Sequence, residues 1–150
     1  MTVEPLAHVD TGGDLPAVVL VHGMTFSKAT WDPVIDRLRG RFRCLAVDLP
    51  GHGESTGSGA DPQVVIERFP ATVVENGLVK PVVVGHSAGA LHATGYGFAH
   101  DSAGVVNVDQ PLWRDPMKWS TCYESSVGVG LVQVAAYSAG VRSLSEECGR

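Results

Sequence analysis

Cysteine is scarce in this sequence, and its spacing is irregular. Cys44, Cys122 and Cys148 are the three cysteines among 150 residues. This number and spacing fit neither a disulfide framework nor the paired ligands of a zinc site. We therefore expect buried or incidental thiols in a reducing, cytoplasmic setting, and neither a metal ion nor a cofactor.

Basic clusters and long apolar runs are also lacking. The formal net charge is -5, so nucleic acids and anionic membrane surfaces are not expected partners. The apolar runs are far too short to span a bilayer. The first five residues have neither the positive region nor the apolar core of a signal peptide. These absences favour a cytoplasmic protein that acts on a small molecule, with no nucleic-acid or membrane partner.

The sequence instead contains an alternation of short apolar runs and helical patterns. The runs are typical of strands buried on both faces of a parallel sheet, and they cover residues 17–21, 43–47, 81–84 and 104–108, with residues 6–9 as an edge strand. Helical patterns cover residues 30–38, 63–76 and 88–99, and Pro70 is expected to break or restart the second. The alternation predicts one α/β domain with a parallel sheet. After residue 109 the order decays, and residues 127–137 fit a strand and a weak helix equally well.

The most informative stretch reads Gly85-His86-Ser87-Ala88-Gly89. A β-branched run precedes it and small residues follow, as a nucleophile elbow requires, because that sharp strand-to-helix turn lifts one serine above the sheet. The pattern predicts Ser87 as the nucleophile of an acyl transfer and the backbone N–H of Ala88 as one donor of an oxyanion hole. The alternative is a buried serine in a glycine-rich turn.

Two further loops follow predicted strands. In His22-Gly23-Met24-Thr25, the N–H of Met24 is the expected second oxyanion donor, with Thr25 next, and His22 is expected to hold the loop by side-chain hydrogen bonds. Gly23, Thr25 and His86 are expected to line the substrate pocket. Residues 48–55 contain Asp48, His52 and Ser55, which could be catalytic, although the glycines and proline favour a structural role in a tight loop.

Residues 19–23, 48–55 and 85–89 resemble the α/β-hydrolase superfamily in order and spacing, and the resemblance covers residues 6–112. It implies the α/β-hydrolase fold, with Ser87 as nucleophile and with Ala88 and Met24 as oxyanion donors. A serine in the elbow argues against the dehalogenases and epoxide hydrolases of this superfamily, which carry aspartate there. The resemblance does not identify the substrate, because the superfamily catalyses many reactions.

The superfamily order is a serine, then an acid, then a histidine that serves as the base. None of the six histidines, at positions 8, 22, 52, 86, 92 and 100, occupies that last place. The base must come from missing sequence, from an unexpected histidine or from a partner chain. Asp109, which ends the strand after the elbow, is the candidate acid, with a turn or cap residue as the alternative; Asp115 is a weaker candidate. We therefore expect a partial, C-terminally truncated hydrolase domain over residues 1–112 and a divergent tail over residues 113–150.

Three functions are consistent with these residues. The first is an esterase-like serine hydrolase that forms an acyl-enzyme on Ser87. The second is a catalytically inactive remnant that binds a small ligand, and the third is a perhydrolase or haloperoxidase-like activity at the same site. A sheet without its last strands also predicts an exposed apolar edge and self-association through it.

Overall fold

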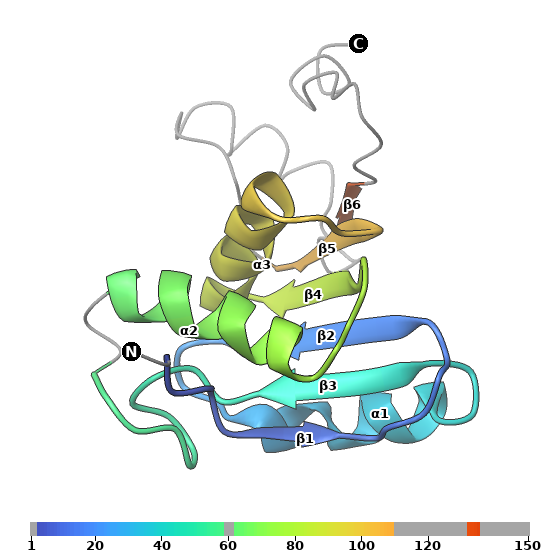
Figure 1. Ribbon diagram of the computed structural model, residues 1–150, viewed down its shortest axis with the longest axis horizontal. Helices are drawn as coiled ribbons and strands as arrows, with labels where there is room; N and C mark the ends of the chain where they lie inside the picture. The colour runs from blue at the N-terminus through green and yellow to red at the C-terminus, as the bar shows by residue number, and fades with distance from the viewer. Residues whose placement is uncertain (1–2, 59–61, 110–131, 136–150) are drawn as a thin grey trace, which may run out of the picture.

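The computed structural model describes residues 3–58, 62–109 and 132–135, which form one twisted sheet with helices on both faces (Figure 1). The six strands lie in the order β1-β3-β2-β4-β5-β6. They are β1 (His8–Asp10), β2 (Ala17–Val21), β3 (Arg43–Val47), β4 (Val82–His86), β5 (Gly104–Val108) and β6 (Val132–Ala135). The central strands β3, β2, β4 and β5 are parallel, as the unbroken apolar runs predict.

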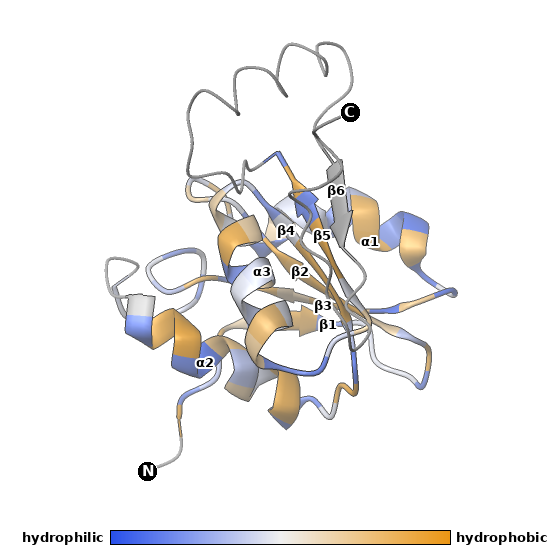
Figure 2. Cartoon of the chain, turned by 90° about the horizontal axis from the view of Figure 1, so that it is seen from above, coloured by the Kyte–Doolittle hydropathy of each residue, from blue (hydrophilic) through white to orange (hydrophobic). Residues whose placement is uncertain are grey.

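The helices divide into two layers. Helix α1 (Asp32–Leu38), which follows the short 3-10 turn η1 (Lys28–Trp31), covers one face of the sheet, and α2 (Pro62–Glu75) and α3 (Ala88–Ala99) cover the other (Figure 2). Strand side chains alternate between the two layers. Val19 and Val21 pack in the cluster beneath α2 and α3, whereas Val18 and Leu20 pack in the cluster that includes Trp31 of η1. Burial of both faces explains why these strands contain hardly any polar residue.

The two outer strands run antiparallel to their neighbours. β1 pairs with β3, so that His8 lies opposite Val47. It begins two residues later than the strand that was predicted over residues 6–9. β6 pairs with β5 and places Val132 opposite Val108. The pairing identifies residues 132–135 of the ambiguous segment 127–137 as a strand. Among the described residues, β6 rather than β5 therefore forms this edge of the sheet. Self-association through this edge remains a prediction, and it would involve β6.

Pro70 lies inside α2, and the prediction that it breaks or restarts the helix is wrong. Proline removes one hydrogen bond, the bond that the carbonyl of Ile66 would accept from residue 70. Val65, Phe69 and Val73 on the same helix are nevertheless buried in the core beneath α2. Burial of these three side chains on both sides of Pro70 outweighs the loss of one hydrogen bond, so the helix continues.

The parallel strands bring their carboxyl ends to one edge of the sheet. The chain passes from β2 to β3 on one side and then returns to β4 on the other, so its direction of winding reverses at β2. In open α/β sheets, ligands bind outside the carboxyl ends of the strands at such a reversal point. The loops after β2, β3, β4 and β5 therefore define the place to examine for chemistry. None of the helices within the described ranges combines the length and apolar character needed to cross a membrane.

Candidate active site

Ser87 occupies the turn between β4 and α3, in a backbone conformation that L-residues rarely adopt. Its φ is 51° and its ψ is -124°. Two hydrogen bonds hold the turn: the N–H of Ser87 donates to the carbonyl of Val108 at 2.8 Å, and the N–H of Ala90 donates to the carbonyl of Ser87 at 2.9 Å. Strained single residues of this kind persist only where the surrounding structure determines them, and they cluster at functional sites.

Gly85 and Gly89 permit this turn because backbone atoms of neighbouring segments occupy the space that a side chain would need. A Cβ at Gly85 would lie 2.5 Å from Ala90 Cα and 2.6 Å from Ala90 N. A Cβ at Gly89 would lie 2.5 Å from the carbonyl oxygen of Val21 and would also overlap the carbonyl oxygen of His22. Real Cβ atoms essentially never approach other heavy atoms this closely. The glycines of the elbow are therefore required by the close contact of α3 with β4 and β2.

The loop after β2 lies directly against the elbow. A Cβ at Gly23 would meet Ser87 Cβ at 3.2 Å and His86 Nδ1 at 3.1 Å. The ring of His86 also packs on that of Phe26, with ring centroids 5.7 Å apart. Gly23 and His86, both predicted to line the pocket, thus lie together beside Ser87, and the side chain of Thr25 is exposed on the same loop.

His22 fixes the peptide group that carries the N–H of Met24. Its Nδ1 donates to the carbonyl of Gly23 at 2.7 Å, while its Nε2 accepts the N–H of Leu49 at 3.0 Å. The N–H of Phe26 also donates to the carbonyl of Gly23, at 3.1 Å. Because a trans peptide points its C=O and N–H in opposite directions, holding the carbonyl of Gly23 also fixes the direction of the Met24 N–H. These contacts confirm the predicted structural role of His22.

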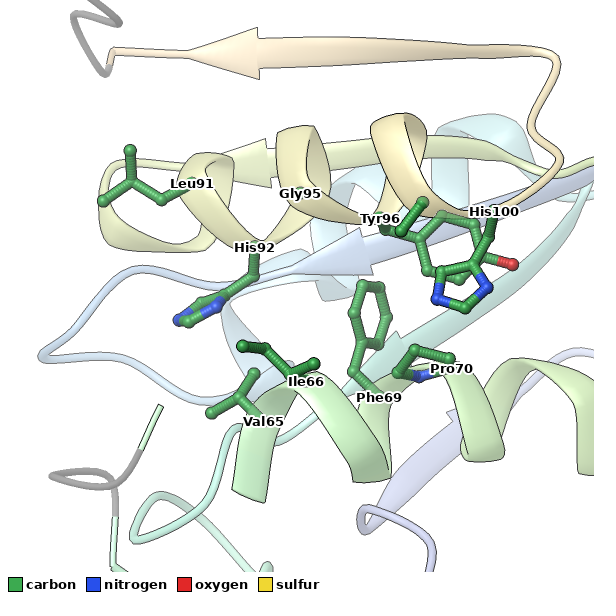
Figure 3. A pocket seen from close by; sticks show the side chains of 10 residues that line it. Val65, Ile66, Phe69, Pro70, Leu91, His92, Gly95, Tyr96 and His100 are labelled. Atoms are coloured by element: carbon green, nitrogen blue, oxygen red, sulfur yellow. The ribbon is translucent and has the colours of Figure 1, made fainter. Parts of the chain in front are cut away.

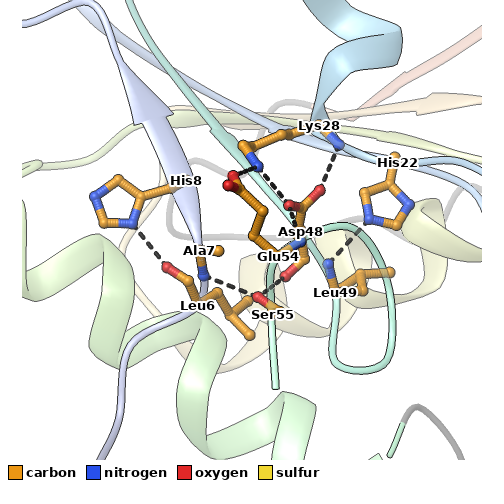
Figure 4. Close-up of polar contacts among 9 residues, drawn as sticks. All are labelled: Leu6, Ala7, His8, His22, Lys28, Asp48, Leu49, Glu54 and Ser55. Carbon is orange, nitrogen blue, oxygen red and sulfur yellow. Dashed lines mark hydrogen bonds and ion pairs between the residues drawn. The ribbon is translucent and has the colours of Figure 1, made fainter. Parts of the chain in front are cut away.

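Asp48 is the structural centre of the loop after β3 (Figure 4). Its buried carboxylate accepts hydrogen bonds from Lys28 N at 2.7 Å, Lys28 Nζ at 2.6 Å and Glu54 N at 2.9 Å. Burial opposes ionisation, but the hydrogen bonds from Glu54 and Lys28 outweigh it and keep the pKa of Asp48 below its usual range. The carboxylate therefore joins the loops after β2 and β3.

Ser55 and His52 also serve this loop. Ser55 Oγ donates to the carbonyl of Asp48 at 2.7 Å and accepts the N–H of Ala7 at 2.8 Å. His52 contacts the carbonyl of Pro50 through Nδ1 at 3.0 Å and the carbonyl of Met24 through Nε2. The three catalytic candidates of this loop, Asp48, His52 and Ser55, therefore all have structural partners, as the glycines and proline indicated. The sequence contained no signal for the part played by Lys28, because only the folded loops bring it to Asp48.

Of the remaining candidates for the catalytic triad, only Asp109 lies among the described residues next to the elbow. Asp109 follows Val108, which pairs with His86, so its backbone lies beside Ser87 at the same edge; its side chain is exposed and its φ is 58°. Among the described residues, no imidazole makes a hydrogen bond with the Ser87 hydroxyl. Asp115, like Cys122 and Cys148, lies outside the described residues, and Cys44 is buried.

A cleft of about 360 Å³ lies between α2 and α3 (Figure 3). Its lining is mainly apolar and includes Phe69, Leu91 and Tyr96, with His92 near one end and His100 near the other. Burial lowers the pKa of His92, so neutral imidazole is favoured there. The lining does not include Ser87, so this cleft is not the site around the elbow.

The buried His22 predicts a loss of stability in mild acid. Burial lowers the pKa of folded His22, and its hydrogen bond to Gly23 offsets this only in part. The unfolded chain consequently takes up a proton first as the pH falls below about 6.5. We expect the free energy of unfolding to decrease from that pH toward the folded pKa, by up to about 1.4 kcal/mol per pH unit for this group. Asp48, with its lowered pKa, adds a second decrease below about pH 4.

Urea unfolding between pH 4.5 and pH 8 measures this dependence. His22→Gln is expected to have a shallower pH slope than the wild type, although His92, whose pKa is lowered in the same direction, keeps part of it. Equal slopes in the wild type and His22→Gln would show that His22 is not the group responsible.

The chain is similar in sequence to known hydrolases. The sequence model of the alpha/beta hydrolase family matches residues 18–144, which extends beyond residue 112, where the recognised motifs end. Pimeloyl-[acyl-carrier protein] methyl ester esterase of Vibrio vulnificus is 36% identical over 115 residues, covering 75% of this chain and 44% of that protein. (E)-2-((N-methylformamido)methylene)succinate hydrolase of Acinetobacter baylyi is 33% identical over 93 residues, covering 59% of this chain and 35% of that protein. The chain thus spans less than half the length of these relatives.

Solved structures show the same likeness. Monoacylglycerol lipase of Paleococcus ferrophilus superposes with a TM-score of 0.63 and 28% identity, over 85% of this chain and 54% of that one. A protein assigned as a non-heme bromoperoxidase in Mycobacterium tuberculosis superposes with a TM-score of 0.66 and 24% identity, over 83% of this chain and 48% of that one. At that identity, the second likeness is one of fold.

Proposed function

The chain belongs to the alpha/beta hydrolase family, and we propose that it is a serine hydrolase that cleaves small carboxylic esters through an acyl-enzyme on Ser87. The observation that carries this proposal is the conformation of Ser87, at φ 51° and ψ -124° between β4 and α3. A serine that served only to cap a helix would not need a strained backbone. This strain is the feature expected of a nucleophile held above the end of a sheet.

The proposed reaction uses the two loops at the carboxyl edge. Ser87 Oγ attacks the ester carbonyl and transfers its proton to a base, and the carbonyl oxygen becomes an oxyanion. The N–H groups of Ala88 and Met24 bind this oxyanion. Preorganised donors of this kind accelerate acyl transfer because they stabilise the negative charge that develops in the transition state. Collapse of the intermediate breaks the bond to the alcohol, which takes up a proton and leaves. Water then attacks the acyl-enzyme and releases the acid and the free Ser87 hydroxyl.

Two observations support Ala88 and Met24 as the donors. Ala88 is the first residue of α3, and the N–H groups of a first helical turn have no partner within the helix. The N–H of Met24 is directed by the hydrogen bonds that hold the carbonyl of Gly23. A helix N-terminus also carries a partial positive charge, which favours an anion at this place.

Asp109 is the acid that we propose for the triad. The N–H of Ser87 donates to the carbonyl of Val108, so the next residue along β5 is a neighbour of the elbow. Its exposed carboxylate is accessible to an imidazole that approaches from above the sheet. Such a carboxylate would orient the imidazole and stabilise its protonated form.

A small ester is the substrate class that fits this site best. The exposed side chains of Met24 and Phe26 on the loop after β2, of which Phe26 packs on His86 next to Ser87, offer an apolar surface to an acyl chain. The Vibrio vulnificus relative is named for the cleavage of a methyl ester, which is the same bond class. Ester cleavage therefore agrees with both the local surface and the similarity in sequence.

Pre-steady-state hydrolysis of p-nitrophenyl acetate and p-nitrophenyl butyrate tests the proposal. An acyl-enzyme predicts a rapid release of about one equivalent of p-nitrophenol, followed by a slower steady state. Release no faster than in the Ser87→Ala variant would instead favour an inactive remnant. Bromination that requires peroxide and a carboxylic acid, without ester cleavage, would favour the perhydrolase reaction.

A further inference from the structure

Both ring nitrogens of His52 face backbone carbonyl oxygens. Nδ1 lies 3.0 Å from the carbonyl oxygen of Pro50, and Nε2 contacts the carbonyl oxygen of Met24. A neutral imidazole carries one N–H and can donate only one hydrogen bond. The two contacts are both hydrogen bonds only when the ring is an imidazolium, which donates from both nitrogens.

The carbonyl of Met24 matters because of its place in the loop. The peptide before Met24 is held through the carbonyl of Gly23, to which His22 and the N–H of Phe26 donate. The peptide after Met24 is held by His52. Met24 itself has a side chain that is 68% exposed, so packing does little to fix the residue. The bonds to the carbonyl of Gly23 set the direction of the Met24 N–H, and the bond from His52 fixes the peptide on the other side of Met24.

The groups around His52 have distinct charges. The ring of His22 lies beside it, with centroids 5.1 Å apart. Burial lowers the pKa of His22 and favours the neutral ring, so His22 adds no competing cation. The same loop carries the carboxylates of Asp48 and Glu54, and Lys28 Nζ is bound to both, at 2.6 Å and 2.5 Å.

We propose that His52 is a positioning residue for the oxyanion hole: as an imidazolium, it ties the carbonyl of Met24 to that of Pro50 and so restricts the backbone of Met24, whose N–H is the proposed donor. Loss of the ring proton leaves one of the two carbonyls without a donor and loosens the loop. The oxyanion hole thereby becomes sensitive to pH through a group that does not touch the substrate. This inference rests on the proposed function, since it assigns Met24 as a donor.

Nuclear magnetic resonance of the full chain tests the inference without turnover. The ring signals of His52 and the backbone amide signals of Met24 and Thr25 are followed from pH 5 to pH 9. We expect the amide signals to shift with the same midpoint as the His52 ring. His52→Gln, which has no titrating ring, is expected to lose this transition. His8→Gln is the matched control, because His8 also bonds to a nearby carbonyl, that of Leu6 at 2.7 Å, but lies in β1.

Amide signals that stay constant while the His52 ring titrates would overturn the proposal, and the wild-type protein alone gives this result. The same transition in His52→Gln would also overturn it, because another group would then be responsible.

Labelling of Ser87 by a fluorophosphonate separates this inference from the proposed function. His52→Phe is expected to be labelled more slowly than the wild type at pH 6, on the order of tenfold, because the second oxyanion donor is no longer held in place. Equal rates would contradict a positioning role. A wild-type chain that is not labelled, but whose Met24 amide follows His52, would reject the hydrolase proposal and retain the link between His52 and the loop.

Discussion

Gly89→Ala is expected to destabilise the chain by about 3 kcal/mol or more, because overpacking against backbone cannot be relieved by a side-chain rotation. The added Cβ would lie 2.5 Å from the carbonyl oxygen of Val21 and 2.9 Å from its carbonyl carbon. These atoms belong to the end of β2, which pairs with both β3 and β4. To accommodate the methyl group, α3 must move away from the sheet, and Ser87 must move with it.

Gly95→Ala is the matched control for this prediction. Gly95 lies in the same helix, but a Cβ there would have no other heavy atom within 4 Å. Alanine is the better helix former, so this variant should be stabilised by about 0.5–1 kcal/mol. Urea unfolding of both variants measures the difference. Equal effects of the two substitutions would show that α3 is not in tight contact with β2.

Ser87→Ala is expected to abolish the acyl-enzyme burst of ester hydrolysis, and where an imidazole serves as the base the loss of activity should reach about 10⁴-fold or more, as removal of the nucleophile does in serine hydrolases. The stability should change little, because alanine and serine incur a similar strain at φ 51°. Ser87→Gly should also be inactive, yet more stable by about 1 kcal/mol, since glycine adopts a positive φ without strain. Together, the two variants separate the chemical role of the hydroxyl from the strain of the elbow.

Ser27→Ala provides the matched serine control. Ser27 lies in the neighbouring loop after β2 and makes no side-chain capping hydrogen bond. We expect the activity of this variant to remain close to that of the wild type. A Ser87→Ala variant that hydrolysed esters as fast as Ser27→Ala would remove Ser87 from the mechanism.

The central sheet and the elbow could be predicted from the sequence because each depends on local pattern. Burial on both faces demands unbroken apolar runs, and residues 17–21 and 43–47 became β2 and β3 without a change of boundary. The strand before the elbow was predicted to begin one residue too early and to end two residues too early, since Gly85 and His86 looked like part of the turn but still pair with β5. The glycines at positions 85 and 89 indicated a tight turn, and the close packing of backbone around both positions requires them.

Features that depend on tertiary contacts could not be predicted in this way. Pro70 normally ends a helix, but the buried neighbours of this residue sustain α2 on both sides. The contact between His52 and Met24 joins residues 28 positions apart, and no periodicity relates two loops. The antiparallel pairing of β6 likewise lay beyond prediction, because its segment has no dominant period.

Intact-mass spectrometry of the chain after treatment with a fluorophosphonate tests the central claim, that the strained serine of the elbow is a nucleophile. We expect a single covalent adduct that maps to the peptide containing Ser87 and is absent from Ser87→Ala. An adduct that persists in Ser87→Ala, or a wild-type chain that remains unmodified, would contradict it.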